Sequence, residues 1–133
     1  IVLEPPVVVL DEPTTGLDFR ECGKVMDAVR DLSAKGTTVV MVCHDMEVVA
    51  DYAQRAIVMT AGQVVADGAT FDVFRNEAAL SRAHLLPPQI VEVSIRLEAR
   101  GLVASDSEIA RANTLDEMTD AIVVQCAKKE GAL

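Results

Sequence analysis

Two carboxylates and a histidine stand directly after two apolar runs. Asp11 and Glu12 follow Val7-Val8-Val9-Leu10, and His44 follows the run at 37–43. Short apolar runs bounded by Pro or Asp are typical of strands that are buried on both faces of a parallel sheet. Ligands of such sheets bind at the carboxyl ends of the strands. The spacing therefore places candidate chemical groups at a ligand-binding edge.

These residue types suit phosphate chemistry that depends on a divalent cation. Mg²⁺ keeps most of its waters and needs only one or two protein oxygens besides substrate phosphates. Neighbouring side chains of an extended strand point to opposite faces, so Asp11 and Glu12 are expected to have different roles. His44 could donate a hydrogen bond to a phosphate without carrying a permanent charge. The alternatives are a polar strand exit for Asp11-Glu12, and a purely structural His44.

The elements that position these residues form a βαβ unit. Asp18 and Glu21 form a capping pair at the start of a helix that Gly36 ends, and the run at 37–43 is the second strand. A short helix is expected at 46–53. Two further β runs, 56–59 and 63–66, flank Gly62 and predict an antiparallel hairpin at the sheet edge. The pattern indicates an α/β fold with a parallel sheet.

The sequence changes character after Leu86. Pro87-Pro88 stops any helix, and the rest of the chain has a helical pattern without β runs. Helices are expected at 89–100, 105–112 and 115–129, the last two with capping boxes at Ser105/Glu108 and Thr114/Glu117. We therefore expect two parts, 1–85 and 86–133. The second is a small helical extension that needs a docking surface to be stable.

Composition excludes several function classes. The 133 residues carry a formal net charge of −9, which argues against a nucleic-acid partner because phosphate binding needs clustered Lys and Arg. No apolar run approaches the roughly 20 residues that cross a bilayer. The three cysteines match no metal-ligand spacing and fit reduced thiols. Because the sequence opens on Ile1 without an initiator Met, we expect it to begin in mid-domain.

The run from Val7 to Asp18, followed by His44-Asp45, closely resembles the ABC-type ATPase family. In that resemblance Val7 to Glu12 correspond to the Walker B strand, Thr14 to Asp18 to the D-loop, and His44 to the switch histidine. The resemblance covers roughly residues 1–85. It implies a partial P-loop NTPase fold that binds ATP and Mg²⁺. Asp11 would orient Mg²⁺ largely through water, Glu12 and His44 would be catalytic, and Asp18 would contribute to nucleotide binding as well as capping a helix.

Two motifs of the family are absent from these 133 residues. There is no Gly-x-x-x-x-Gly-Lys-[Ser/Thr] loop and no Leu-Ser-Gly-Gly-Gln signature. In the family both precede the Walker B strand, and the loop supplies most of the phosphate contacts. We therefore expect the chain by itself to be inactive as an ATPase.

The finer resemblance is to importers of the energy-coupling factor and cobalt or nickel group. It rests on Thr15-Gly16-Leu17-Asp18, on Asp72-Val73-Phe74 and on Leu85-Leu86-Pro87-Pro88-Gln89. It implies a second ATPase subunit and transmembrane subunits as partners, at the cytoplasmic face of the membrane. The alternatives are an ABC ATPase without a transport role, and a non-catalytic dimerisation or regulatory module.

Overall fold

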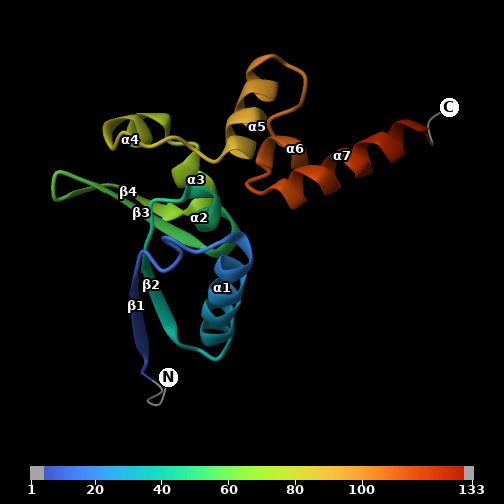
Figure 1. The fold of residues 1–133 in the computed structure, drawn as a ribbon. Helices are drawn as coiled ribbons and strands as arrows, with labels where there is room; N and C mark the ends of the chain where they lie inside the picture. The colour runs from blue at the N-terminus through green and yellow to red at the C-terminus, as the bar shows by residue number, and fades with distance from the viewer. Residues whose placement is uncertain (1–4, 131–133) are drawn as a thin grey trace. The chain divides into compact units, whose positions relative to one another are not determined.

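The computed structural model describes residues 5–130, and side chains up to residue 128 (Figure 1). Contacts divide the chain after Asp45 into two compact units. The elements in chain order are β1 (Val7–Asp11), α1 (Phe19–Ala34), β2 (Thr38–Val42), α2 (Met46–Tyr52), β3 (Arg55–Thr60), β4 (Gln63–Ala69), α3 (Thr70–Phe74), α4 (Glu77–Arg82), α5 (Gln89–Ala99), α6 (Glu108–Arg111) and α7 (Leu115–Glu130).

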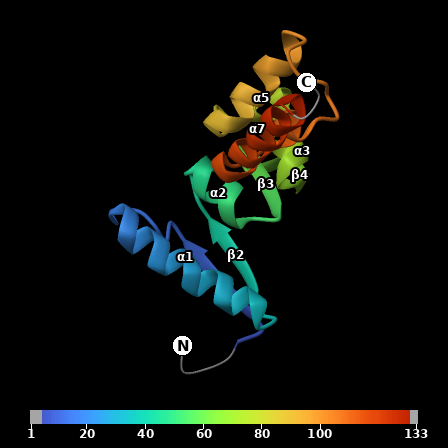
Figure 2. The same cartoon turned by 90° about the vertical axis from the view of Figure 1, so that its right-hand side faces the viewer.

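The first unit is the predicted βαβ arrangement. Strands β1 and β2 pair in parallel, with Val8 opposite Val39 and Asp11 opposite Val42. Helix α1 lies along one face of the pair, as both views show (Figures 1 and 2). Its Met26 is buried, and the Asp18 carboxylate accepts the N–H of Glu21 at 2.9 Å. The predicted strand, cap and helix are therefore confirmed.

The second unit begins with α2 and the hairpin of β3 and β4. The two strands pair antiparallel, with an irregularity between Val58 and Met59, and they turn at Ala61-Gly62, where both residues have positive φ. Val58 forms a buried cluster with Val73 of α3 and Leu80 of α4. Within the described residues the hairpin is a two-stranded sheet of its own. It is not hydrogen-bonded to β1 and β2, whereas the sequence predicted it at the edge of that sheet.

The C-terminal helices pack around a separate cluster of Ile109, Ala112, Met118 and Ala121. The predicted capping box of α7 is confirmed: Glu117 N–H donates to Thr114 Oγ1 at 3.2 Å, and Thr114 N–H donates to Glu117 Oε2 at 3.3 Å. The predicted helix at 105–112 is wrong in extent. Helix α6 has only four residues, and its cap is Ser107, whose Oγ accepts the N–H of Ala110.

In the sequence, the residues of the two hydrophobic clusters fall on either side of Pro87-Pro88. The cluster of Val58, Val73 and Leu80 includes Leu85, and the cluster of the C-terminal helices begins with Ile90. The boundary between 1–85 and 86–133 stays a prediction, because the contacts alone divide the chain after Asp45. In the part of the chain that is described, no helix is both long and apolar enough for a membrane span.

Candidate functional site

The end of β1 carries the candidate site. Glu12 N–H donates to the carbonyl of Val42 at 2.9 Å, so pairing with β2 continues one residue beyond the strand. At Glu12 the backbone then turns sharply, with φ of 47°. This left-handed conformation is uncommon for a residue other than Gly and costs roughly 1–3 kcal/mol. Such strain concentrates at functional sites, and here it lies on Glu12, which the family resemblance predicts to be catalytic.

The structure brings the two predicted catalytic side chains together. His44 Nδ1 lies 2.6 Å from Glu12 Oε2, although 32 residues separate the two in sequence. The parallel register explains this contact. Asp11 lies opposite Val42 at the ends of the two strands, and Glu12 and His44 follow these strand ends within one and two residues. An ionised carboxylate only accepts hydrogen bonds, so Nδ1 is the donor in this pair. The site lies at the surface, with the His44 side chain 75% exposed and that of Glu12 33% exposed.

Thr15 is the third member of the site, and sequence reasoning did not single it out. Its Oγ1 donates to the same Glu12 Oε2 at 3.2 Å, and its N–H donates to the Glu12 carbonyl at 3.2 Å. The available signal was local, because a Thr three residues after a carboxylate in a turn can reach back to it. The bonds from Thr15 Oγ1 and His44 Nδ1 converge on Oε2 and orient the carboxylate.

Pairing changes the acidity of both groups. The hydrogen bond from His44 holds the pKa of the Glu12 carboxyl below its ordinary value. The hydrogen bond to Glu12, and next its negative charge, raise the pKa of His44 above 6.5. Each partner favours the charged form of the other. The result is a carboxylate that stays ionised beside an imidazole that keeps its proton to higher pH.

These shifts predict how the pair responds to pH. The contribution of His44 to stability is full below pH 6.5 and is lost as pH rises through its higher folded-state pKa. The contribution of Glu12 is full above pH 4.5 and is lost as pH falls through its lower folded-state pKa. In nucleotide-free protein, NMR should therefore show His44 titrating above 6.5, and Glu12→Gln should lower that midpoint. An unchanged midpoint in Glu12→Gln would contradict the pairing.

The other predicted site residues are Asp11, at the end of β1, and Asp18, just before α1. Asp11 is the last residue of β1 and is exposed at the carboxyl end of the sheet. The carboxylate of Asp18 caps α1. The capping role is therefore confirmed, whereas a role of Asp18 in nucleotide binding stays a prediction.

The donor set fits a magnesium ion that is held mainly by phosphates and water. Among the described residues there is no group of three or more His, Cys, Asp or Glu side chains that could hold a metal ion by themselves. Asp11 offers one carboxylate at the strand end, which is what Mg²⁺ in a phosphate site requires of the protein. The residues present thus suit Mg²⁺ bound together with a nucleotide.

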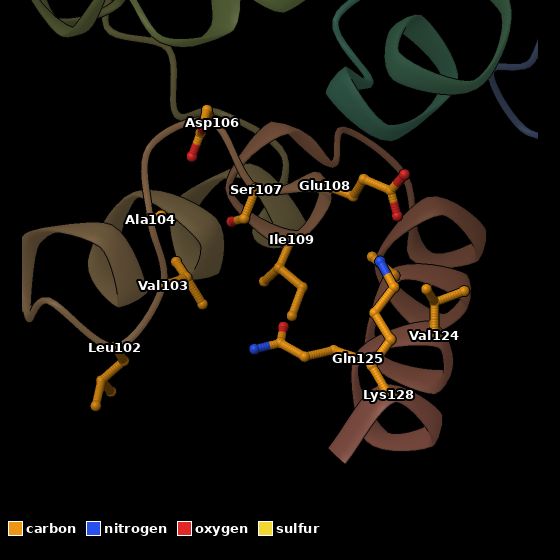
Figure 3. A pocket seen from close by; sticks show the side chains of 11 residues that line it. Leu102, Val103, Ala104, Asp106, Ser107, Glu108, Ile109, Val124, Gln125 and Lys128 are labelled. Atoms are coloured by element: carbon orange, nitrogen blue, oxygen red, sulfur yellow. The ribbon is translucent and has the colours of Figure 1, made fainter. Parts of the chain in front are cut away.

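A groove in the C-terminal helices is separate from this site. It has a volume of about 460 Å³ and lies between the α5–α6 connection and α7 (Figure 3). Figure 3 shows Gln125 extending from α7 toward Ile109, with Val103 on the opposite wall. None of the predicted catalytic or nucleotide-binding residues lines it, so we do not assign it to the nucleotide.

Comparison with known proteins shows the relatives of this chain. No protein-family model matches it. It is 44% identical over 101 residues to a putative ABC transporter ATP-binding protein of Methanosarcina mazei, a match that covers 76% of this chain and 17% of that protein. It is 35% identical over 123 residues to the energy-coupling factor transporter ATP-binding protein EcfA2 of Streptococcus thermophilus, which covers 92% of this chain and 42% of that protein.

A solved structure agrees with these relatives. CbiO1 from Clostridium perfringens, described as part of the ABC transporter complex CbiONQ, matches 73% of this chain and 34% of its own length. Its TM-score is 0.50 at 30% identity. The fold is part of the P-loop NTPase fold of ABC-type ATPases. This chain belongs to the ATP-binding proteins of ABC transporters, and the predicted likeness to the energy-coupling factor and CbiO group is confirmed. It spans 17% to 42% of the two curated relatives described above.

Proposed function

We propose that Asp11, Glu12 and His44 form the part of an ATP-binding site that carries out hydrolysis, in an ATPase subunit that drives an ABC-type importer. The observation that carries the proposal is the 2.6 Å contact between Glu12 and His44 at the ends of paired parallel strands. The importer part is supported by likeness to EcfA2, which is named as an energy-coupling factor transporter protein, and to CbiO1. By "complete subunit" we mean a polypeptide in which these residues follow a phosphate-binding loop.

Glu12 is the general base of the proposed reaction. Thr15 Oγ1 and His44 Nδ1 both bond to Glu12 Oε2, which leaves Oε1 to accept a proton from the attacking water. His44 can shift its N–H from Glu12 to the terminal phosphate as negative charge develops there. Asp11, at the end of β1, would hold Mg²⁺ largely through water. When bound, Mg²⁺ would supply positive charge that stabilises the negative charge of the phosphates.

The partners follow from the same proposal. A phosphate-binding loop and a signature sequence are absent from these residues, so both must come from another part of the subunit or from a second ATPase subunit. Transmembrane subunits would convert closure of the two ATPase subunits into transport. The protein would then lie at the cytoplasmic face of the membrane through those subunits. Failure to find a phosphate-binding loop upstream of Ile1 would instead favour a non-catalytic module.

Substitution of Asp11 and His44 separates the two roles in the complete subunit. Asp11→Asn should weaken Mg²⁺-dependent ATP binding roughly 10- to 100-fold, because the water shell of the ion loses its charged acceptor. His44→Ala should leave binding intact and lower turnover about 10²-fold, because one transition-state donor is removed. Calorimetry with and without Mg²⁺, together with phosphate release, measures both effects.

A matched control is Asp31→Asn, which neutralises an exposed Asp on α1. It should change neither Mg²⁺ dependence nor turnover. A Mg²⁺ requirement that Asp11→Asn leaves untouched would show that Asp11 does not belong to the nucleotide site.

A further inference from the structure

The Glu12 carboxylate needs other groups to fix its direction. The last torsion of a Glu side chain has a broad, roughly twofold preference, so the choice of rotamer alone does not set the plane of the carboxylate. The side chain is also 33% exposed, and packing therefore restrains it only in part. Hydrogen bonds must hold the plane. Two side-chain donors, His44 Nδ1 and Thr15 Oγ1, bond to the same oxygen, Oε2.

Thr15 is held by the same turn that carries Glu12. Its N–H donates to the carbonyl of Glu12 at 3.2 Å, which closes a four-residue turn. Its Oγ1 donates to Glu12 Oε2, also at 3.2 Å. Because a β-branched side chain is stiff about its first torsion, the hydroxyl can be directed at one target. A single turn of the chain thus places both the hydroxyl and the carboxylate.

Both ends of this turn are fixed within the first unit. At its start, Glu12 N–H donates to the carbonyl of Val42 at 2.9 Å. Beyond it, Leu17 N–H donates to the carbonyl of Thr14 at 3.2 Å, and Asp18 caps α1. All of these contacts join residues of one compact unit. The turn is therefore a firm base from which a hydroxyl can hold a carboxylate.

The two side-chain donors differ in what the proposed reaction asks of them. The His44 side chain is 75% exposed, and its N–H is proposed to move from Glu12 to the terminal phosphate as negative charge develops there. Oε2 then loses its 2.6 Å hydrogen bond. The backbone N–H of His44 also bonds to this carboxylate, with a smaller effect on the pKa of Glu12 than the Thr15 hydroxyl has. The hydroxyl is fixed by the turn, so it can stay on Oε2 throughout.

We propose that Thr15 is a positioning residue that holds the Glu12 carboxylate during the chemical step, while the His44 imidazole serves the phosphate. The inference rests on the proposed ATPase function. Thr15 acts through Glu12: it keeps Oε2 engaged, so that Oε1 stays directed at the attacking water. A residue with this role affects the rate of the chemical step and leaves the affinity for Mg-ATP nearly unchanged.

The test compares Thr15→Val and Thr15→Ser in the complete subunit. Thr15→Val keeps the branched shape and removes the hydroxyl. It should lower kcat for ATP hydrolysis roughly three- to tenfold, with KM for Mg-ATP within about twofold, because a misplaced catalytic group slows the chemical step. Thr15→Ser keeps the donor and should retain at least about half of the parent kcat. Rates are expressed per ATP-binding site, counted by calorimetry, so that a loss of folded protein cannot imitate the effect.

A second comparison tests the division of labour between Thr15 and His44. If the imidazole has left Glu12 during the chemical step, Thr15→Val should lower kcat by the same factor, within about twofold, in the parent and in His44→Ala. If the imidazole stayed on Glu12, the two donors would replace each other. Thr15→Val would then cost little in the parent and much more in His44→Ala, and that result would overturn the inference.

The matched control is Thr119→Val, which removes an exposed hydroxyl that donates to the carbonyl of Leu115 within α7. Its kcat should equal that of the parent protein. An unchanged kcat in Thr15→Val, or a Thr15→Ser protein as slow as Thr15→Val, would also overturn the inference. The failure of the proposed function itself would look different, since Glu12→Gln would then hydrolyse ATP at the parent rate in the same assay.

Discussion

Replacement of Glu12 by Gln is expected to abolish most ATP hydrolysis in the complete subunit while ATP still binds. The Gln amide has the same size and keeps an oxygen that can accept from Thr15, but it cannot take a proton from water. Loss of a positioned general base lowers turnover roughly 10²-fold or more. Phosphate release at saturating Mg-ATP measures turnover, and calorimetry measures binding. We expect a collapse in the first and little change in the second.

The control for this substitution is Glu77→Gln on α4, an exposed carboxylate in the second unit. It makes the same chemical change away from β1 and should hydrolyse ATP at the parent rate. Equal turnover of Glu12→Gln and the parent protein would defeat the assignment of Glu12 as the base. A loss of binding together with turnover would instead indicate that the substitution disturbs the turn at Glu12, where φ is positive.

Local patterns predicted much of the fold because each depends on residues close in sequence. The cap of α1 by Asp18 and the reciprocal bonds of Thr114 and Glu117 were visible as short motifs. The start of α6 was not, because Ser105 and Ser107 both precede the helix and only the folded geometry selects Ser107. Helix α4, at Glu77–Arg82, is not among the elements that the sequence predicts.

The burial of β1 shows a second limit of prediction from the sequence. The run Val7 to Leu10 predicts a strand that is buried on both faces, which holds only where both faces of the sheet are covered. In this chain Val8 and Leu10 lie half-buried on one face, while Val7 and Val9 are exposed on the other. A continuous apolar run indicates that both faces of the strand need to be covered. It does not indicate whether the helices that cover them are encoded in these 133 residues.

The candidate site was predicted from a family motif, but its geometry was not. Sequence placed Glu12 and His44 at strand ends, and only the register of β1 and β2 explains their 2.6 Å contact. In the second unit, a hydrogen bond from Gln89 N–H to Glu47 and those from Arg75 to Ala110 and Asn113 join residues 35 to 42 positions apart. No local motif encodes such pairs, because they depend on how the helices pack.

The exposed face of β1 and β2 leads to the second prediction of large effect. Val7, Val9, Val40 and Val42 are 51%, 67%, 48% and 53% exposed, and they lie on the face opposite α1. Contiguous apolar surface beside unpaired strand edges favours association with another chain. We therefore expect the isolated 133 residues to self-associate in solution. We also expect them to bind Mg-ATP no more tightly than roughly millimolar, because no phosphate-binding loop is present.

Sedimentation velocity and calorimetry on the isolated chain test both parts of this prediction. Val9→Lys combined with Val40→Lys should shift the chain toward monomer, because two charges then interrupt the apolar face at paired positions. The control is Phe19→Lys, which alters a side chain that is 94% exposed at the start of α1 and lies outside that face. It should leave self-association unchanged. If the parent chain is instead a monodisperse monomer with micromolar affinity for ATP, the prediction is wrong. The exposed valines would then not cause self-association, and tight ATP binding would not need the phosphate-binding loop.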